Sequence, residues 1–131
     1  MRDLADGTVV MSSAYNGRIA AAQAEQKGFR MVWAGGIYDF DFWALPSGVF
    51  KKELAEQFVN FAGQPQQQKA FAENIAYGPT NRKAVELLAP DVAANLPTAP
   101  QNIANAVGMN VAFWAEHGDA LEQRFQAWAK R

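Results

Sequence analysis

Strand-like and helix-like patterns are unevenly divided along this chain, and that division limits its possible folds more than any other feature. Short apolar, β-branched or aromatic runs typical of strands occur only in the first third, at 8–11, 29–33 and 35–46. The rest is almost wholly helical by periodicity. Three short strands cannot cover four or five amphipathic helices in a balanced layer arrangement. We therefore expect an α/β chain with few short strands and several helices, which is a fragment of a larger fold or is completed by dimerisation.

Glycine, proline and capping residues divide the helical part into segments. An Ala- and Gln-rich run predicts a helix over 18–26. Leu54, Phe58 and Phe61 share one face of a helix that ends at Gly63. Further helices are expected from Pro65, from Arg82 with Asn81 as its cap, from Pro90, and after Asp119.

Composition narrows the class of function. The 131 residues carry 12 Lys and Arg against 13 Asp and Glu, a net charge of −1, and the basic residues are scattered, so no nucleic-acid partner is expected. Zero cysteines exclude disulfides and thiolate chemistry. No apolar run approaches the roughly 18 residues that span a bilayer. The start, Met1 to Gly7, lacks the apolar core of a signal peptide, so the chain is expected to carry no export address.

No catalytic or metal-binding constellation is apparent in the sequence. His117 is the only histidine, and its neighbours lack the i, i+4 ligand spacing of a metal-binding helix. The serines at positions 12, 13 and 47 have no plausible general base. We expect a protein that is not an enzyme and that uses no metal or cofactor.

The run from Gly35 to Pro46 has the most distinctive chemistry. It interleaves four aromatic rings with two carboxylates, Asp39 and Asp41. Ammonium groups are held by aromatic faces and by opposite charge. A core strand avoids acids, because burying an unpaired carboxylate is costly. The run therefore indicates a pocket for an organic cation, and the alternative is a sheet-edge strand whose acids face solvent.

Four motifs follow one another in a fixed order over nearly the entire chain. They are Tyr15-Asn16-Gly17, the run from Gly35 to Pro46, the segment from Leu54 to Phe61, and Tyr77-Gly78-Pro79-Thr80-Asn81. In this order they resemble the C-terminal part of periplasmic solute-binding proteins of ABC transporters, most closely the spermidine/putrescine-binding group.

This resemblance implies part of a two-lobed type II periplasmic binding protein that closes on its solute and signals to a membrane permease. Residues 1–28 would end the second lobe, 29–46 would form hinge strands, and 47–131 would be helices of the first lobe. The implied function is import of a small cationic solute such as putrescine or spermidine. The alternative is a truncated derivative that self-associates through exposed apolar surface and has no ligand of its own.

The resemblance also assigns candidate ligand-binding residues. Asp41 matches a carboxylate that pairs with a ligand ammonium, and Tyr15 matches a ring that stacks on the ligand. Tyr38 and Trp43 would wall the cleft, although such rings also occur as core residues. Each assignment has a plain alternative, a solvent-facing acid for Asp41 and a turn tyrosine for Tyr15.

Asp39 departs from the polyamine pattern, which has an aromatic residue at that position. In a strand, Asp39 and Asp41 would point to the same face. Two carboxylates there would suit a more highly charged or hydroxylated amine. Relatives in the family take other solutes, including amino acids, opines and phosphonates, so these stay open. If the solute is an amino acid, Arg18 could pair with its carboxylate; otherwise Arg18 is a solvated helix-surface residue.

Overall fold

The computed structural model describes residues 1–25 and 28–130, and within them it is rich in helix with one short strand pair. The elements in chain order are α1 (Arg2–Ala5), α2 (Asn16–Ala24), β1 (Ile37–Tyr38), α3 (Lys52–Ala62), α4 (Pro65–Ile75), α5 (Arg82–Glu86), α6 (Pro90–Ala94), α7 (Pro100–Ile103), β2 (Val107–Gly108) and α8 (Val111–Ala129). None of these helices is long and apolar enough to cross a membrane.

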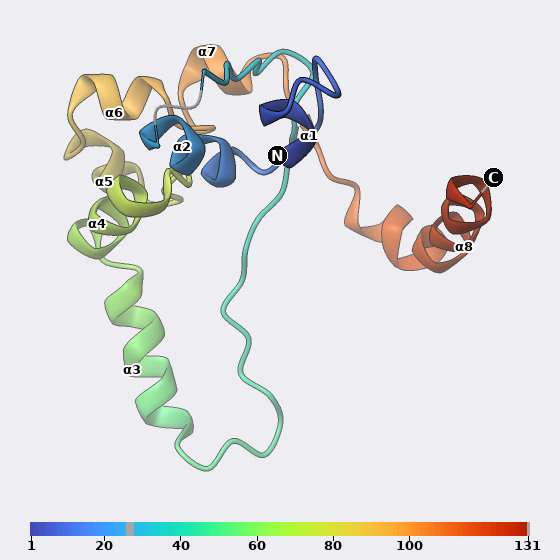
Figure 1. Cartoon of the computed structure of the whole chain (residues 1–131). Helices are drawn as coiled ribbons and strands as arrows, with labels where there is room; N and C mark the ends of the chain where they lie inside the picture. The colour runs from blue at the N-terminus through green and yellow to red at the C-terminus, as the bar shows by residue number, and fades with distance from the viewer. Residues whose placement is uncertain (26–27, 131) are drawn as a thin grey trace.

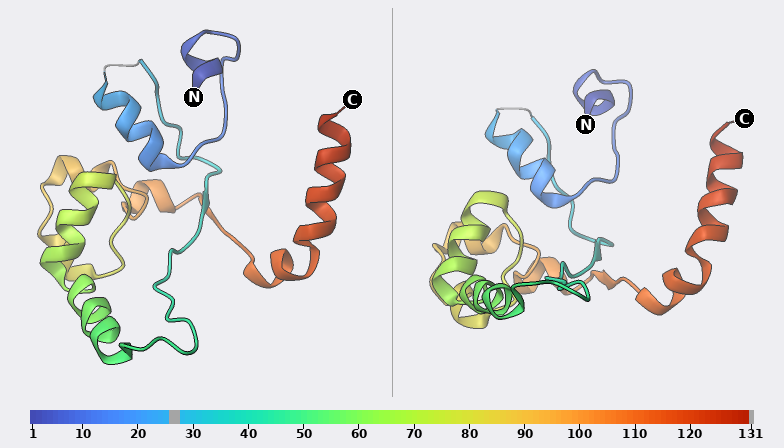
Figure 2. Two further views of the ribbon diagram at one scale, coloured as in Figure 1. Left: turned by 60° about the horizontal axis from the view of Figure 1, so that its bottom comes forward. Right: turned by 90° about the horizontal axis from the view of Figure 1, so that it is seen from below.

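The elements form a small helical body with three extensions. Helices α4 to α7 lie close together, and α2 lies beside them (Figure 1). Helix α3 projects from this body, and an extended arm, residues 39–51, runs out to meet its start (Figure 1). Helix α8 lies apart from the body in Figure 1 and in both views of Figure 2.

The core of the body is small and lies between α4, α5 and α6. Ala72, Leu88 and Leu96 are buried there, and Leu96 is 1% exposed. Val92 and Ala93 of α6 cover the cluster from one side. The body therefore has a small packed core, although Phe71 and Ile75 of α4 remain partly exposed.

Helices α4, α5 and α6 begin where the sequence predicts, whereas no helix was expected at α7. Helices α4 and α6 each have proline in their first turn, where no backbone donor is lost. Asn81 caps α5, because its Oδ1 accepts a hydrogen bond from the Lys83 amide at 3.1 Å. Its Nδ2 also donates to the Gly63 carbonyl at 3.0 Å. The same side chain thus caps one helix and ties it to the end of α3.

Substituting Asn81 by alanine is expected to lower the free energy of unfolding by about 0.5–2 kcal/mol, because the cap of α5 is lost. Urea unfolding followed by circular dichroism measures this change. Asn105→Ala is the control, since the Asn105 side chain is exposed and forms no hydrogen bond with a described residue. Equal effects of the two substitutions would contradict a capping role for Asn81.

The expected strands at 8–11 and 29–33 are wrong. Neither run pairs with another segment among the described residues, and β1 pairs only with β2. Val10 is 96% exposed and Met11 81%. Strand propensity alone does not form a strand, because a ladder needs a neighbouring chain to receive its hydrogen bonds.

The run 29–33 nevertheless keeps the alternation that suggested a strand. Phe29, Met31 and Trp33 are half-buried, and the two residues between them are exposed. The run has no strand partner in the described chain, and the Gln23 side chain donates to the Phe29 carbonyl at 2.8 Å. The preceding helix, expected over 18–26, begins earlier, at Asn16, and ends at Ala24; residue 26 lies outside the described part.

The last helix begins nine residues before the expected start, at Val111. Asn110 caps α8, since its Oδ1 accepts from the Phe113 amide at 3.0 Å. Gly118 and Asp119, read as a helix start, lie inside α8. Glycine is tolerated inside a helix at some cost in stability, so it does not always mark a boundary.

Candidate ligand-binding site

The short ladder between β1 and β2 positions the run that carries the two carboxylates. Its strands are parallel, with Ile37 opposite Val107 and Tyr38 opposite Gly108. The Val107 amide donates to the Gly36 carbonyl and the Met109 amide to the Tyr38 carbonyl, each at 2.9 Å. The ladder stops at Tyr38, so Asp39 is the first residue of the unpaired arm.

The two carboxylates differ in what they contact. Asp39 turns onto its own backbone, where its Oδ1 accepts from the Phe40 amide at 2.8 Å. Asp41 is exposed and forms no hydrogen bond or ion pair with any residue in the described part. Asp41 is therefore the carboxylate that is available to an incoming cation.

Tyr38 is held against the second strand. Its ring is half-buried and meets the edge of Phe40 at a centroid distance of 6.0 Å. A Cβ added at Gly108 would lie 3.0 Å from the Tyr38 hydroxyl oxygen. The absence of a side chain at Gly108 thus leaves the space that the Tyr38 ring fills.

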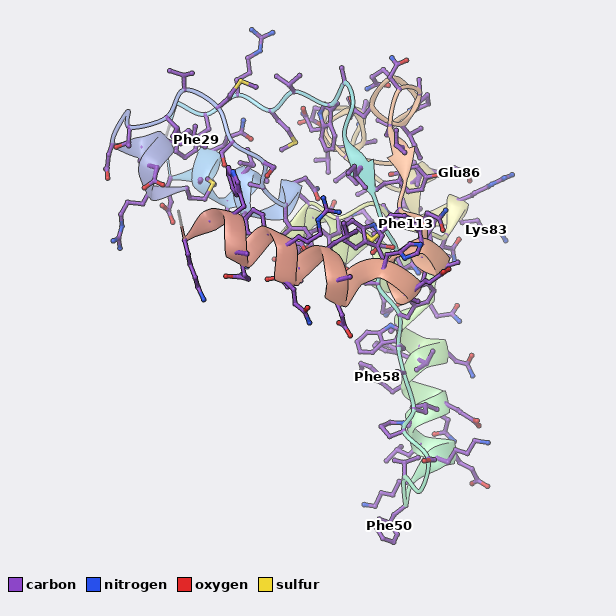
Figure 3. The ribbon with its side chains drawn as sticks, turned by 90° about the vertical axis from the view of Figure 1, so that its right-hand side faces the viewer. Phe29, Phe50, Phe58, Lys83, Glu86 and Phe113 are labelled. Atoms are coloured by element: carbon purple, nitrogen blue, oxygen red, sulfur yellow. The ribbon has the colours of Figure 1, made fainter. Side chains whose placement is uncertain are left out.

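Trp43 packs on a different element from the other candidates. Its ring stands edge-on to Phe58 of α3 at 5.1 Å. An open hollow of about 330 Å³ lies there, lined by Trp43, Leu45, Glu56, Val59 and Asn60. Figure 3 shows Phe58 partway along α3 and Phe50 at the tip of the arm. The structure thus associates Trp43 with α3 and not with Tyr15.

Tyr15 and Arg18 stand together at the start of α2. Tyr15 precedes the helix in an extended conformation and is 71% exposed. The Arg18 guanidinium lies 5.8 Å from the centre of the Tyr15 ring, a cation–π arrangement. Arg18 has no carboxylate partner among the described residues. This pair offers an aromatic face and a free positive charge at one place.

The start of α2 is fixed on α4 through two adjacent residues. The Asn16 side chain donates to the Ala76 carbonyl at 2.6 Å. A Cβ added at Gly17 would lie 2.8 Å from the Ile75 carbonyl oxygen and 2.8 Å from a ring carbon of Tyr77. The close approach therefore requires glycine at position 17.

Gly17→Ala is expected to destabilise the protein by about 1–3 kcal/mol, because the added methyl group forces α2 away from α4. Chemical unfolding gives the value. Gly28→Ala serves as the control, since its Cβ would meet no atom of the described residues within 4 Å. A Gly17→Ala protein as stable as the Gly28→Ala protein would contradict this close packing.

The predicted residues thus fall into three groups. Tyr15 lies at the start of α2, Tyr38, Asp39 and Asp41 follow β1, and Trp43 lies against α3. No hydrogen bond, ion pair or ring contact joins these groups within the described residues. The same part of the chain holds no cluster of metal-ligating side chains. Sequence reasoning included Gly17 in a motif but missed its close packing on α4, and it missed Gly108; both roles depend on residues about 60 and 70 positions away.

Comparisons with known proteins show which family and which relatives this chain resembles. Residues 1–101 match the family model described as bacterial extracellular solute-binding protein. A gamma-aminobutyric acid-binding protein of Pseudomonas aeruginosa is 52% identical over 128 residues, which are 98% of this chain. This chain spans 36% of the length of that relative.

Solved structures show the same arrangement within longer chains. A GABA receptor matches 97% of this chain with a TM-score of 0.82 and 28% identity, and the match covers 39% of that receptor. The PBP AgtB of A. tumefaciens R10, solved in complex with agropinic acid, matches 88% of this chain with a TM-score of 0.77 and 34% identity. The match covers 37% of AgtB. An ABC transporter substrate-binding protein of Bradyrhizobium japonicum USDA 110 matches 96%, with a TM-score of 0.78 and 32% identity, over 40% of its length.

Proposed function

We propose that this chain, which belongs to the bacterial extracellular solute-binding protein family, binds a small zwitterionic solute of the amino acid or opine class. It would do so as the solute-binding component of an ABC importer, outside the cytoplasmic membrane. The observation that carries the proposal is the 52% identity with a gamma-aminobutyric acid-binding protein over nearly the whole chain.

The expected polyamine ligand finds no support among the relatives. Their names specify gamma-aminobutyric acid and agropinic acid. The amino acid or opine alternative fits these relatives better, and it also fits the presence of Asp39 where the polyamine pattern has an aromatic residue. The resemblance to the spermidine/putrescine group therefore holds at the level of the wider family.

A zwitterionic solute carries one ammonium and one carboxylate, and this chain offers a free partner for each. Asp41 supplies an exposed carboxylate that is not already paired with a described residue. Arg18 supplies a guanidinium, which is well shaped for a carboxylate. Each charge-assisted hydrogen bond would contribute about 1.5–3 kcal/mol. Tyr15, beside Arg18, would cover the aliphatic part of the solute.

The other two candidates support the site less directly. Tyr38 immediately precedes the carboxylate pair and would set the direction in which the arm leaves the ladder. Trp43 lies on the α3 side of the arm and would reach the solute only when the cleft closes. Closing of the lobes on the solute would signal to the permease.

Isothermal titration calorimetry of the 131-residue chain tests this function. The ligands are γ-aminobutyrate, agropinic acid, putrescine and spermidine. We expect saturable binding for one of the first two and no saturation for the polyamines. A flat trace for all four, or tighter binding of a polyamine, would overturn the proposal.

A further inference from the structure

Asn16 and Gly17 form the only Asn-Gly pair in the sequence. Such a pair favours a turn, because both residues tolerate left-handed backbone. The structure places them instead as the first two residues of α2, where the backbone is helical. Both residues also contact the end of α4, through the Ala76 carbonyl and the Ile75 carbonyl respectively. The contacts with α4 therefore oppose the local preference of the pair.

In a flexible chain, an Asn-Gly pair loses ammonia. The Gly17 backbone nitrogen attacks the side-chain carbonyl carbon of Asn16, the bond from that carbon to Nδ2 breaks, and Nδ2 leaves as ammonia with the Gly17 amide proton. Water then opens the five-membered succinimide ring at either carbonyl, which gives aspartate or isoaspartate. Glycine favours this reaction, because it has no side chain to hinder the approach and adopts the widest range of backbone conformations.

Helix α2 prevents this ring from closing in two ways. The ring requires the Asn16 side-chain carbon and the Gly17 nitrogen to lie nearly in one plane with the bonds between them, which a helical ψ of about −42° does not allow. The Asn16 Nδ2 also donates to the Ala76 carbonyl at 2.6 Å, which holds the side chain on α4. The native packing therefore protects Asn16 from the chemistry that its neighbour favours.

The docking of α2 on α4, which gives this protection, is limited in extent. Helix α2 has nine residues, and only Ile19 and Ala22 among them are buried. A hollow of about 180 Å³ lies between the two helices, lined by Ala20 and Ala21 on one side and Asn74 on the other. A short helix with few buried side chains opens locally at a smaller free-energy cost than global unfolding. Such opening releases both the backbone and the side chain of Asn16.

We propose that Asn16 is a site of spontaneous deamidation, which the docking of α2 on α4 protects and which local opening of α2 exposes. The change is irreversible for the fold. A carboxylate at position 16 has no proton to donate to the Ala76 carbonyl, and its oxygens would face that carbonyl oxygen. Isoaspartate also adds a carbon to the main chain beside Gly17, where the approach to Ile75 leaves no space. The proposal does not depend on which solute is bound.

Mass spectrometry of the full 131-residue chain after incubation in mildly alkaline buffer tests the proposal. The tryptic peptide 3–18 contains one asparagine and no glutamine, so a deamidation mass gain in it belongs to Asn16. We expect this gain to accumulate at least tenfold more slowly in the folded chain than in the same chain unfolded in guanidinium chloride. Chromatography of the peptide separates the aspartate and isoaspartate products.

Two variants separate the opening of α2 from the chemistry of the pair. Ile19→Ala removes a buried side chain of α2 and should speed deamidation of the folded chain severalfold. Ile37→Ala makes the same truncation at a side chain that is 70% exposed, and should leave the rate unchanged. Equal rates in these two variants would overturn the proposal. Equal rates in the folded and unfolded chain, or no mass gain even in the unfolded chain, would overturn it as well.

The variant Asn16→Asp tests whether the product docks again. Hydrogen exchange of the α2 amides should be faster in this protein than in Asn105→Asp, which introduces the same charge at an exposed asparagine. Exchange that is equally slow in both variants would show that a carboxylate at position 16 is compatible with docking, and this result would also overturn the proposal.

Discussion

Replacing Asp41 by asparagine is expected to weaken binding of γ-aminobutyrate by about 10- to 150-fold. Asparagine keeps the size and shape of the side chain but removes the charge, so it removes one charge-assisted hydrogen bond worth about 1.5–3 kcal/mol. Asp41 forms no hydrogen bond or ion pair with a described residue, so the substitution breaks no contact there that the fold uses. Calorimetry measures the affinity, and urea unfolding verifies that stability is unchanged.

Two further substitutions make the Asp41 test specific. Asp119→Asn removes an exposed carboxylate on α8 and should leave affinity unchanged. Asp39→Asn should have a smaller effect than Asp41→Asn, because Asp39 already accepts a hydrogen bond from the Phe40 amide. Unchanged affinity in the Asp41→Asn protein, with saturable binding by the unsubstituted protein, would exclude Asp41 from the site while leaving the solute class intact.

Leu96→Ala is expected to lower the free energy of unfolding by about 2–5 kcal/mol. Leu96 is 1% exposed and packs with Ala72 and Leu88 at the centre of the only hydrophobic cluster found in the described part of the chain. Alanine leaves a cavity that the surrounding helices fill only in part. Because the cluster is small, the loss is a large fraction of the stability of a domain of this size.

Leu87→Ala is the matched control for the core. Leu87 ends α5 beside the buried Leu88 and is 45% exposed, so the same truncation removes little buried surface. Urea unfolding of both variants, followed by circular dichroism, compares them directly. A Leu96→Ala protein that unfolds at the same urea concentration as Leu87→Ala would show that this cluster does not hold the body together.

The local signals predicted the body of the protein well. Proline at the start of α4 and asparagine before α5 act within a few residues of their own position, so they can be read from the sequence. The start of α8 was missed because Gly118 suggested a boundary more strongly than Asn110 suggested a cap. Both residues have a local meaning, and only the structure shows that the Asn110 side chain bonds to the Phe113 amide.

Long-range features could not be predicted in the same way. The runs at 8–11 and 29–33 have strand composition but no partner in the described chain, and a partner is not encoded in the run itself. The residue types of the candidate site were predicted from charge and aromaticity, whereas their division among α2, the arm and α3 depends on the fold. Whether Asp41, Tyr15, Asp39, Trp43 and Tyr38 bind a solute stays a prediction.

The pairing of β1 with β2 has a consequence for the order of folding. Ile37 and Val107 are opposite each other although 70 positions separate them (107 minus 37), and the helices α3 to α7 lie in the loop that this ladder closes. Two residues per strand return little free energy for closing so long a loop. We therefore expect the helical body to form first and the ladder last. Asp41, three residues beyond β1, would then acquire its place only in the final folding step, after the rest of the body is native.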